Sequence, residues 1–318
     1  MAPRGAGERP VVLGRANSTV CGVDCAVLPY VRVSVVLNRE AGRAPAPDAL
    51  AQALARGLPG AEVIEIARSV ESGAFERAAA GADLLVAAGG DGTVSAVAAA
   101  AARTGRPFGV IPCGTLNHFA RDMGIPAALD EAIAVIAAGH TRAIDTGDLN
   151  GRMFVNNASA GAYPRLVWER NRARRRGLPR PAAMGVAVAR TWMGLRSDTV
   201  RLTVDGVALV RRTPFIFVGN SSYEVEGTEI GRRPVMTDGT LSLCMAPKFG
   251  RIDALLLPVR VLARTLERHE RFETLTAELV VVRTGRPRVR VALDGEVRVF
   301  GGPLSFAVRR NAVTVVAP

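Results

Sequence analysis

The sequence predicts an α/β domain with a parallel sheet that binds a nucleotide, followed by a second, mostly β domain that is sandwich-like. Two observations lead to this prediction. Short apolar runs alternate with segments of helical composition over residues 31–139, whereas strand-like segments dominate after Thr141. Strands that alternate with helices form parallel sheets, and runs of strands form sandwiches or barrels.

The composition is that of a folded protein with a substantial core. The chain has 318 residues, of which 48% are hydrophobic, and this length favours about two domains. Its apolar runs are short and interrupted by Arg, Asp or Gly, so we expect none to cross a bilayer. Residues 1–29 lack the compact apolar stretch of a secretory signal, and we interpret them as a loose extension. The four scattered cysteines fit a reducing cytoplasm.

The formal net charge of +12 does not select a partner. A basic protein attracts nucleic acid, anionic membranes and polyphosphates alike. Lys248 is the only lysine, and such an arginine bias also arises from a GC-rich coding sequence. We therefore do not count the charge as evidence for nucleic-acid binding.

The first domain is expected over residues 30–142. Strand-like runs occur at residues 31–37, 61–66, 83–88 and 107–111, and helical segments at 48–55, 74–80, 94–103 and 129–138. Gly139 follows the last helix as a C-terminal cap. In a parallel sheet the ligand crevice lies beyond the carboxyl ends of the strands. Three glycine-bearing loops, residues 38–42, 89–93 and 112–117, should therefore share one rim.

The second domain is expected over residues 143–318. Its strand-like segments are residues 153–158, 200–204, 215–219, 241–245, 278–282, 289–293 and 297–300. Helical inserts are expected at residues 182–195 and 252–266. This composition predicts a mostly β domain.

The loop after the third strand has the features of a phosphate cradle. It consists of Gly89, Gly90, Asp91, Gly92 and Thr93. Glycines let the backbone approach a ligand closely, and the N-terminus of the next helix favours anions. The loop is neither a Walker A motif, since no Lys-Ser or Lys-Thr follows, nor a dinucleotide fingerprint. Asp91 either caps the helix or acts through a divalent cation or proton transfer, and its small neighbours favour the second interpretation.

Four more motifs follow this loop in order. They are PCGTLNHFAR at 112–121, VGN at 218–220, DGTL at 238–241 and LDGE at 293–296. Together with the GGDGT loop they resemble the diacylglycerol kinase catalytic-domain family, which includes soluble bacterial lipid kinases. GGDGT alone is shared with NAD kinases. The resemblance covers residues 31–318 and implies a nucleotide-binding α/β domain, a sandwich-like domain, ATP in the cleft between them, and a last strand that returns to the first domain.

The resemblance also implies roles for individual residues. ATP would contact Asn38, Gly42, Gly89, Gly90, Asp91, Gly92, Thr93, Gly114, Thr115 and Asn117. Asp91 and Glu296 would be catalytic, with Glu296 as the base that takes the proton from a lipid hydroxyl while Mg²⁺ stabilises charge. Asp294 would point to the other face of the chain, and Asp294-Gly295 would form a hairpin turn.

The resemblance further implies a structural Mg²⁺ held by Asp238 and by the backbone carbonyls of Val235 and Thr240. Oxygen ligands suit this ion. The alternative is that Asp238 is a turn residue before Gly239.

The sequence departs from the family pattern at three positions. Ser95, Ala96 and Arg39 stand where many members have Asn, Glu and Pro. Loss of the Glu removes a carboxylate near the nucleotide, which puts the catalytic rate in doubt more than nucleotide binding. A nucleotide-binding regulator without kinase activity therefore stays open as an alternative. An NAD kinase also stays open, because it shares the GGDGT loop.

An arginine run suggests a membrane partner. Arg170, Arg172, Arg174, Arg175 and Arg176 follow Trp168 and precede Met184, Trp192 and Met193. Arginine beside tryptophan suits an anionic membrane interface, and the alternative is a solvated helix followed by a packed apolar one. No nucleic-acid motif accompanies the run.

We therefore expect a lipid kinase of phospholipid metabolism, with diacylglycerol as the acceptor. It would be cytoplasmic and peripheral to the inner face of the membrane, and would bind no nucleic acid. A homodimer is left open.

Overall fold

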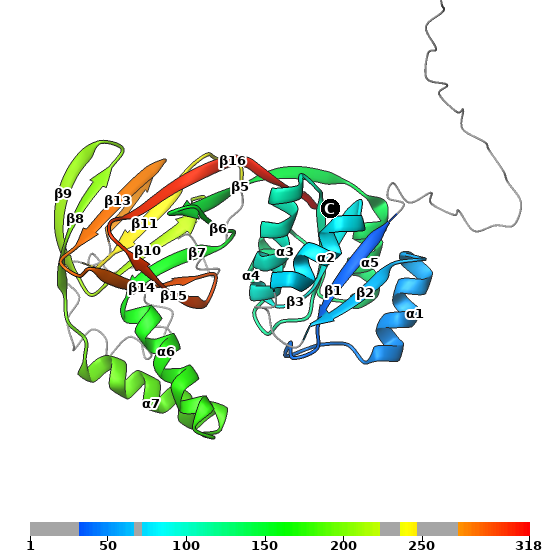
Figure 1. The fold of residues 1–318 in the computed structure, drawn as a ribbon, viewed down its shortest axis with the longest axis horizontal. Helices are drawn as coiled ribbons and strands as arrows, with labels where there is room; N and C mark the ends of the chain where they lie inside the picture. Colours follow the sequence, from blue (N-terminus) through cyan, green and yellow to red (C-terminus); the bar gives the residue numbers. More distant parts are fainter. Residues whose placement is uncertain (1–31, 67–71, 223–235, 247–272) are drawn as a thin grey trace, which may run out of the picture.

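The computed structural model describes residues 32–66, 72–222, 236–246 and 273–318 (Figure 1). The helix expected at residues 252–266 and the expected ligand Val235 lie outside these ranges. The described chain forms an α/β domain joined to a β-sandwich, which confirms the predicted fold class.

The first domain contains every strand and helix that the sequence predicts. Its strands are β1 (Val33–Asn38), β2 (Glu62–Ile66), β3 (Leu84–Gly89) and β4 (Phe108–Pro112), which pair in parallel in the order β2-β1-β3-β4. Its helices are α1 (Pro47–Gly57), α2 (Ser72–Gly81), α3 (Asp91–Thr104), α4 (His118–Asp122) and α5 (Leu129–Ala138). Only α4, a single short turn of helix, was not expected.

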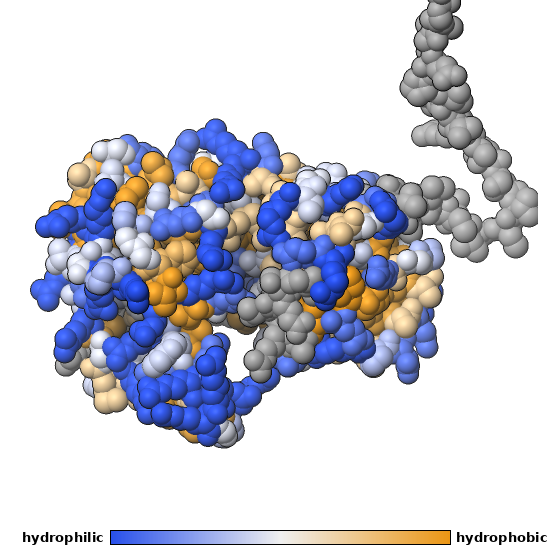
Figure 2. All heavy atoms as spheres, viewed as in Figure 1, coloured by the Kyte–Doolittle hydropathy of each residue, from blue (hydrophilic) through white to orange (hydrophobic). Residues whose placement is uncertain are grey.

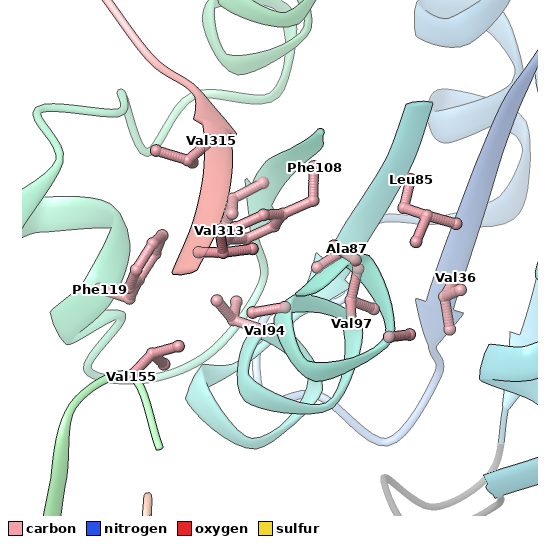
Figure 3. Close-up of a cluster of buried hydrophobic side chains, with 14 of the residues drawn as sticks. Val36, Leu85, Ala87, Val94, Val97, Phe108, Phe119, Val155, Val313 and Val315 are labelled. Carbon is pink, nitrogen blue, oxygen red and sulfur yellow. The ribbon is translucent and has the colours of Figure 1, made fainter. Parts of the chain in front are cut away.

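Helices cover both faces of this sheet because side chains alternate along each strand. Val35 packs with α1 and α5 on one face, while Val36 packs with α2 and α3 on the other. Val94 and Val97 of α3 lie against this second face (Figure 3). β3 is buried along its whole length, which explains its continuous apolar sequence. The packing fixes α3 with its first turn at the carboxyl end of β3.

Two long strands join the domains into one sheet. β5 (Thr141–Leu149) and β16 (Leu304–Val316) pair antiparallel and extend across both domains (Figure 1). At its end β16 lies parallel to β4, with Val315 opposite Phe108. The first domain was expected to have a parallel sheet of its own, but the sheet is mixed and continues into the sandwich. The boundary expected between residues 142 and 143 falls inside β5.

The second domain is a sandwich of two antiparallel layers. One layer continues the long sheet through β13 (Leu279–Thr284), β8 (Asp198–Val204) and β9 (Val207–Thr213). The other has the order β12 (Glu273–Ala277), β11 (Leu241–Met245), β10 (Phe215–Asn220), β7 (Asn157–Gly161), β14 (Arg288–Leu293) and β15 (Glu296–Gly301). Leu202 and Phe306 of the first layer form one core with Val218 and Val291 of the second. The expected sandwich is therefore present.

One segment expected as a single strand is interrupted, and another begins one residue later than expected. Residues 153–158 split into β6 (Arg152–Phe154) and β7, because the N–H groups of Val155 and Asn156 donate to Asp294. The strand expected at 278–282 begins at Leu279, because the N–H groups of Glu278 and Leu279 donate to Asp205. At both places a carboxylate accepts the backbone N–H groups that would otherwise donate to a neighbouring strand.

A helical hairpin projects from the sandwich (Figure 1). It consists of α6 (Ala162–Arg175), which contacts β7, β14 and β15, and α7 (Arg180–Met193), which packs on α6. The insert expected at residues 182–195 corresponds to α7. Among the described residues, no helix has the length and apolar character needed to cross a membrane.

Candidate active site

The three glycine-bearing loops meet at the carboxyl ends of the strands, as the sequence predicts. A Cβ atom placed on Gly90 would lie 3.3 Å from the Cα of Gly114, and one placed on Gly114 would lie 2.6 Å from the Cα of Gly90. A Cβ on Gly42 would lie 2.9 Å from Oγ1 of Thr115. Only glycine allows backbones to approach so closely. The loops therefore form one surface.

Hydrogen bonds hold the rim together. Nδ2 of Asn38 donates to Oγ1 of Thr93 at 3.1 Å, and the N–H of Cys113 donates to the carbonyl of Gly89 at 2.9 Å. Asn117 has a left-handed backbone with φ 49°, and its Oδ1 accepts the N–H of Gly114 at 2.8 Å. The structure thus brings all the expected nucleotide-binding residues together and shows how Asn38 and Asn117 shape the loops.

Asp91 lies in the first turn of α3, where its carboxylate faces the neighbouring helix. Its Oδ1 accepts the N–H of Phe119 at 3.2 Å. Asp91 therefore caps α4, whereas α3, in which it lies, has no side-chain cap. This contact keeps the loop at 112–117 beside the loop at 89–93. Asp91 is partly exposed, so it also remains accessible to a ligand at the rim.

Asp294 connects the second domain to α3. Its carboxylate accepts the hydroxyl of Ser95 at 2.5 Å and the N–H groups of Val155, Asn156 and Asn157 at 2.8–3.0 Å. Burial raises the pKa of this carboxyl, and the hydrogen bond from Ser95 and those from the three backbone groups oppose the rise. From the sequence, Asp294 was expected only to form a turn.

The hairpin turn at Asp294-Gly295 is confirmed, because both residues have positive φ and Leu293 pairs with Glu296 across it. Asp294 and Glu296 line the same cavity, but their carboxylates have different partners: that of Asp294 binds Ser95 and three backbone N–H groups, and that of Glu296 binds Arg298. That Asp294 points to the other face of the chain stays a prediction. The proximity of Asp294 to Ser95 joins positions far apart in the chain, and no local pattern signals it.

A cavity of about 510 Å³ is lined by residues of α3 and of this hairpin, beside the contact between Ser95 and Asp294. Gly92, Ser95 and Ala96 line its first-domain side, and Asp294 and Glu296 line the opposite side. Oε2 of Glu296 accepts a hydrogen bond from Arg298 at 3.1 Å. The expected base therefore lines the same cavity as Gly92, which is the one residue of the expected phosphate loop in this lining.

Four arginines line the cavity, and they differ in their partners. Arg103 pairs with Glu76 at 3.1 Å, Arg309 with Asp148 at 2.6 Å, and Arg298 with Glu296. Arg152 makes no side-chain hydrogen bond or ion pair with the residues that the structure describes. Its guanidinium is thus available to an anion, although the sequence did not single it out.

Asp238 has the geometry of a turn residue. Its Oδ2 accepts the N–H and the hydroxyl of Ser222 at 2.8 and 2.7 Å, and its Oδ1 accepts the N–H of Thr240 at 3.2 Å. Gly239 follows with φ 67°. Burial is the largest single influence and raises the pKa of Asp238, but these hydrogen bonds together lower it below its ordinary value. The carboxylate is therefore ionised and anchors the loop.

The described residues do not form a metal cage around Asp238. The carbonyl of Thr240 accepts the N–H of Ser221 at 3.0 Å. A cation that bound this carbonyl and the Asp238 carboxylate would therefore share both with N–H or O–H donors. Within the described ranges, no three His, Cys, Asp or Glu side chains cluster as a metal site requires. The metal role of Asp238, Thr240 and Val235 stays a prediction.

The VGN and DGTL motifs meet at a buried carboxylate that the sequence did not reveal. Asp145 is 2% exposed, and its oxygens accept the N–H groups of Gly239 and Asn311, both at 2.8 Å. Nδ2 of Asn220 donates to the carbonyl of Asp145 at 2.8 Å and to that of Val155 at 3.1 Å. These contacts lock β5, β10 and β16 together where the domains join. Asp145 lies in no motif, so its role is visible only in the structure.

Two family models match the chain. Residues 32–149 match the diacylglycerol kinase catalytic domain, and residues 158–317 match the YegS C-terminal NAD kinase beta sandwich-like domain.

Curated relatives match shorter stretches. A diacylglycerol kinase of Staphylococcus epidermidis is 45% identical over 89 residues, which are 27% of this chain and 28% of the relative. A diacylglycerol kinase of Staphylococcus aureus is 29% identical over 168 residues, or 52% of this chain and 53% of the relative. An uncharacterized protein of Synechocystis sp. is 27% identical over 261 residues, or 80% and 59%. The chain thus spans between about a quarter and three-fifths of these relatives.

A solved structure shares the fold. The crystal structure of a putative diacylglycerol kinase from Bacillus anthracis superposes with a TM-score of 0.70 at 20% identity, covering 91% of this chain and 98% of that one. At this identity the likeness concerns the fold.

Proposed function

We propose that this chain, which belongs to the diacylglycerol kinase catalytic-domain family, transfers the γ-phosphate of ATP to the hydroxyl of a membrane lipid, with diacylglycerol as the expected acceptor. One observation carries the proposal. Gly92 of the glycine loop at the start of α3 lines one cavity together with Asp294 and Glu296 of the second domain. A phosphate donor and a group that removes a proton are both needed for such a transfer.

The rim suits the phosphates of ATP. The first N–H groups of a helix have no partner within the helix, and those of α3 follow directly after Gly90. Asn38, Gly42, Gly114, Thr115 and Asn117 would complete the nucleotide site on the two neighbouring loops, as the resemblance implies. A divalent cation bound with ATP would neutralise part of the phosphate charge.

Glu296 is our choice for the general base. The lipid oxygen forms a bond to the γ-phosphorus, the bond from that phosphorus to the β–γ bridging oxygen breaks, and ADP leaves. Glu296 accepts the proton that the hydroxyl loses. Asp294 is less suited to this role because four donors already occupy its carboxylate.

Two further residues have roles in the proposed phosphoryl transfer. Arg152 lines the cavity and would stabilise negative charge on the transferred phosphoryl group. The partly exposed Asp91 would act at the phosphate loop, while its contact with Phe119 keeps the rim assembled. A lipid acceptor would bring the protein to the inner face of the membrane, in phospholipid biosynthesis.

An acceptor panel tests the proposal. The protein is incubated with γ-labelled ATP and Mg²⁺, and with detergent micelles that contain diacylglycerol, monoacylglycerol or a sphingoid base, and with NAD in a separate reaction. Label in a lipid, absent from a Glu296→Gln preparation, supports a lipid kinase and identifies the acceptor. Label in NAD alone supports an NAD kinase. Nucleotide binding without label in any acceptor supports the silent regulator.

A further inference from the structure

The proposed base Glu296 shares its strand and its cavity with an arginine. Glu296 and Arg298 are two residues apart on β15, so their side chains lie on the same face of the strand. Both residues line the cavity of about 510 Å³, and Nη2 of Arg298 donates to Oε2 of Glu296 at 3.1 Å. This ion pair therefore belongs to the wall of the cavity in which we place the phosphoryl transfer.

The pairing of β15 with β14 fixes the backbone at Glu296. The two strands pair from Arg288 opposite Gly301 to Leu293 opposite Glu296, and their hairpin points toward the first domain (Figure 1). The side chain of a glutamate has several rotatable bonds, and a fixed backbone alone does not select one rotamer. The orientation of the carboxylate therefore depends on the groups around it.

Arg298 supplies a polar contact that β14 does not. The residues opposite Glu296 and Arg298 on β14 are Leu293 and Val291, which are both apolar. Among the strands that the structure describes, β14 is the one neighbour of β15 in the sheet. A polar contact from within the hairpin consequently reaches the Glu296 carboxylate from Arg298, along the same strand.

The other arginines of the cavity are committed elsewhere. Arg103 pairs with Glu76, and Arg309 pairs with Asp148. Arg152 is the group that we assign to the transferred phosphoryl charge. Figure 2 shows hydrophilic side chains on the part of the sandwich that faces the first domain. Within this polar wall, Arg298 is the arginine whose position is coupled to the proposed base.

The exposure of the ion pair indicates a role in catalysis more than in folding. The side chains of Arg298 and Glu296 are 41% and 32% exposed, and exposed ion pairs contribute little to stability. A general base, however, must lie within hydrogen-bond reach of the proton that it takes. A carboxylate has about four acceptor positions, so the hydrogen bond from Arg298 leaves the group able to accept a proton.

We propose that Arg298 is a positioning residue for this base. Its guanidinium holds the Glu296 carboxylate in the orientation that receives the proton of the lipid hydroxyl, and Arg298 itself contacts neither ATP nor the lipid. The proton passes from the hydroxyl oxygen to Glu296, while the arginine side chain stays protonated throughout. The inference rests on the proposed function, because it needs Glu296 to act as the base.

Substitutions of Arg298 separate orientation from folding. Arg298→Met keeps a long side chain but removes the charge and the N–H donors. We expect kcat to fall roughly 10- to 100-fold, the effect of a small displacement of a catalytic group, with KM for ATP nearly constant and thermal unfolding as in the wild type. Arg298→Lys keeps a charged donor and should recover part of the loss.

Three results would contradict the positioning role. A wild-type kcat in Arg298→Met would show that the base needs no such partner. A raised KM for ATP with unchanged kcat would show that Arg298 binds the nucleotide. Equal loss in the Lys and Met variants would show that a positive donor at this position does not orient the base.

Arg211→Met is the matched control. Arg211 also pairs with a glutamate, since its Nε and Nη2 donate to Glu273 at 2.7 and 2.8 Å, and its side chain is 31% exposed. This pair joins β9 to β12, and neither residue lines the cavity. The control should keep the kcat of the wild type. Equal loss of kcat in Arg211→Met and Arg298→Met would reduce the effect to the loss of any ion pair and overturn the proposal.

A double-mutant cycle identifies the group through which Arg298 acts. If Arg298 acts only through Glu296, Arg298→Met should lower the turnover of the wild type but not that of Glu296→Gln. Single-turnover labelling with γ-labelled ATP measures the slow variants. Losses that multiply in the double variant would assign Arg298 a role of its own and overturn the inference.

The wild-type reaction with the acceptor panel separates this inference from the proposed function. No labelled lipid with the wild type would overturn both. Full activity of Glu296→Gln would remove the base and the positioning role with it, but would leave the lipid kinase. Activity that is lost in Glu296→Gln and retained in Arg298→Met would overturn the positioning role alone.

Discussion

The hydroxyl of Ser95 donates a 2.5 Å hydrogen bond to the carboxylate of Asp294. Ser95 lies in α3, directly after the phosphate loop, and Asp294 begins the turn that leads to Glu296. One contact therefore sets the position of the phosphate loop relative to the proposed base.

Ser95→Ala removes the donor and leaves Asp294 with its three backbone partners. We expect the free energy of unfolding to fall by about 1–3 kcal/mol, the usual cost of losing a hydrogen bond to a charged or buried group. Turnover should fall as well, with KM for ATP nearly constant. Chemical denaturation and steady-state kinetics measure the two effects. Unchanged values for both would show that the contact has no role in joining the domains.

Glu296→Gln keeps the shape of the side chain but cannot accept a proton. If Glu296 is the base, turnover should fall by roughly 10²- to 10⁴-fold, with ATP affinity nearly constant. The acidic limb of the pH–rate profile should disappear. Glu62→Gln, an exposed change on β2, is the control. Full turnover in Glu296→Gln would transfer the role to another carboxylate, with Asp91 as the next candidate.

Asp91→Asn retains an oxygen that can accept the N–H of Phe119 and loses only the charge. We expect a folded protein with the thermal stability of the wild type and no detectable phosphoryl transfer. Thermal unfolding followed by circular dichroism measures the stability, and the labelling reaction measures phosphoryl transfer. An active variant would restrict Asp91 to its observed role as a cap.

Gly90→Ala and Gly114→Ala should each push the loop at 89–93 away from the loop at 112–117, but by different amounts. The Cβ added at position 114 lies closer to backbone than the one added at position 90, 2.6 Å against 3.3 Å. We expect a loss of about 1–3 kcal/mol in stability and weaker ATP binding, with the larger effect at position 114. Gly81→Ala is the control, because a Cβ there meets nothing within 4 Å. The reverse order of effects in calorimetry would contradict the close approach of these loops.

Asp238→Asn tests whether the charge of the Asp238 carboxylate stabilises the DGTL turn. The folded pKa of Asp238 is lowered, so its contribution to stability is present above the ordinary carboxyl pKa and is lost as the pH falls through the folded value. The variant should be less stable by about 1–3 kcal/mol at neutral pH and should lose part of this acid dependence.

The same variant tests the metal prediction. A structural Mg²⁺ would raise the Tm of the wild type as its concentration increases, and would leave Asp238→Asn unaffected. A wild-type Tm independent of Mg²⁺ and of chelator would show that Asp238 acts only through Ser222 and Thr240.

The first domain could be predicted from the sequence because its signals are local. Buried parallel strands such as β3 are continuous apolar runs, and glycines follow them where the chain must turn. In contrast, β9 lies at the edge of its sheet, and its apolar residues include the exposed Val207 and Val210 as well as the core-facing Leu209, so its sequence does not mark one buried face. The short helix α4 depends on a cap from Asp91, which is distant in sequence.

The same distinction applies to the site. The nucleotide loops are recognised from glycine spacing, which is a local property. Asp145, Arg152 and the contact between Ser95 and Asp294 depend on pairing between distant segments. Such pairing is set by the way β5 and β16 cross the molecule, and a single sequence carries no pattern for it.

The ribbon formed by β5 and β16 determines how the cleft can open. A flexible linker would let the domains rotate freely, but a hydrogen-bonded ribbon resists shear along its strands and bends most easily across its plane. The pairing is irregular between Arg309 and Val313, but the N–H of Asn311 within this stretch donates to the buried Asp145, which holds the ribbon where its pairing is broken. Opening and closing should therefore be an elastic flexing of small amplitude, which returns the cleft to one resting geometry after each catalytic cycle.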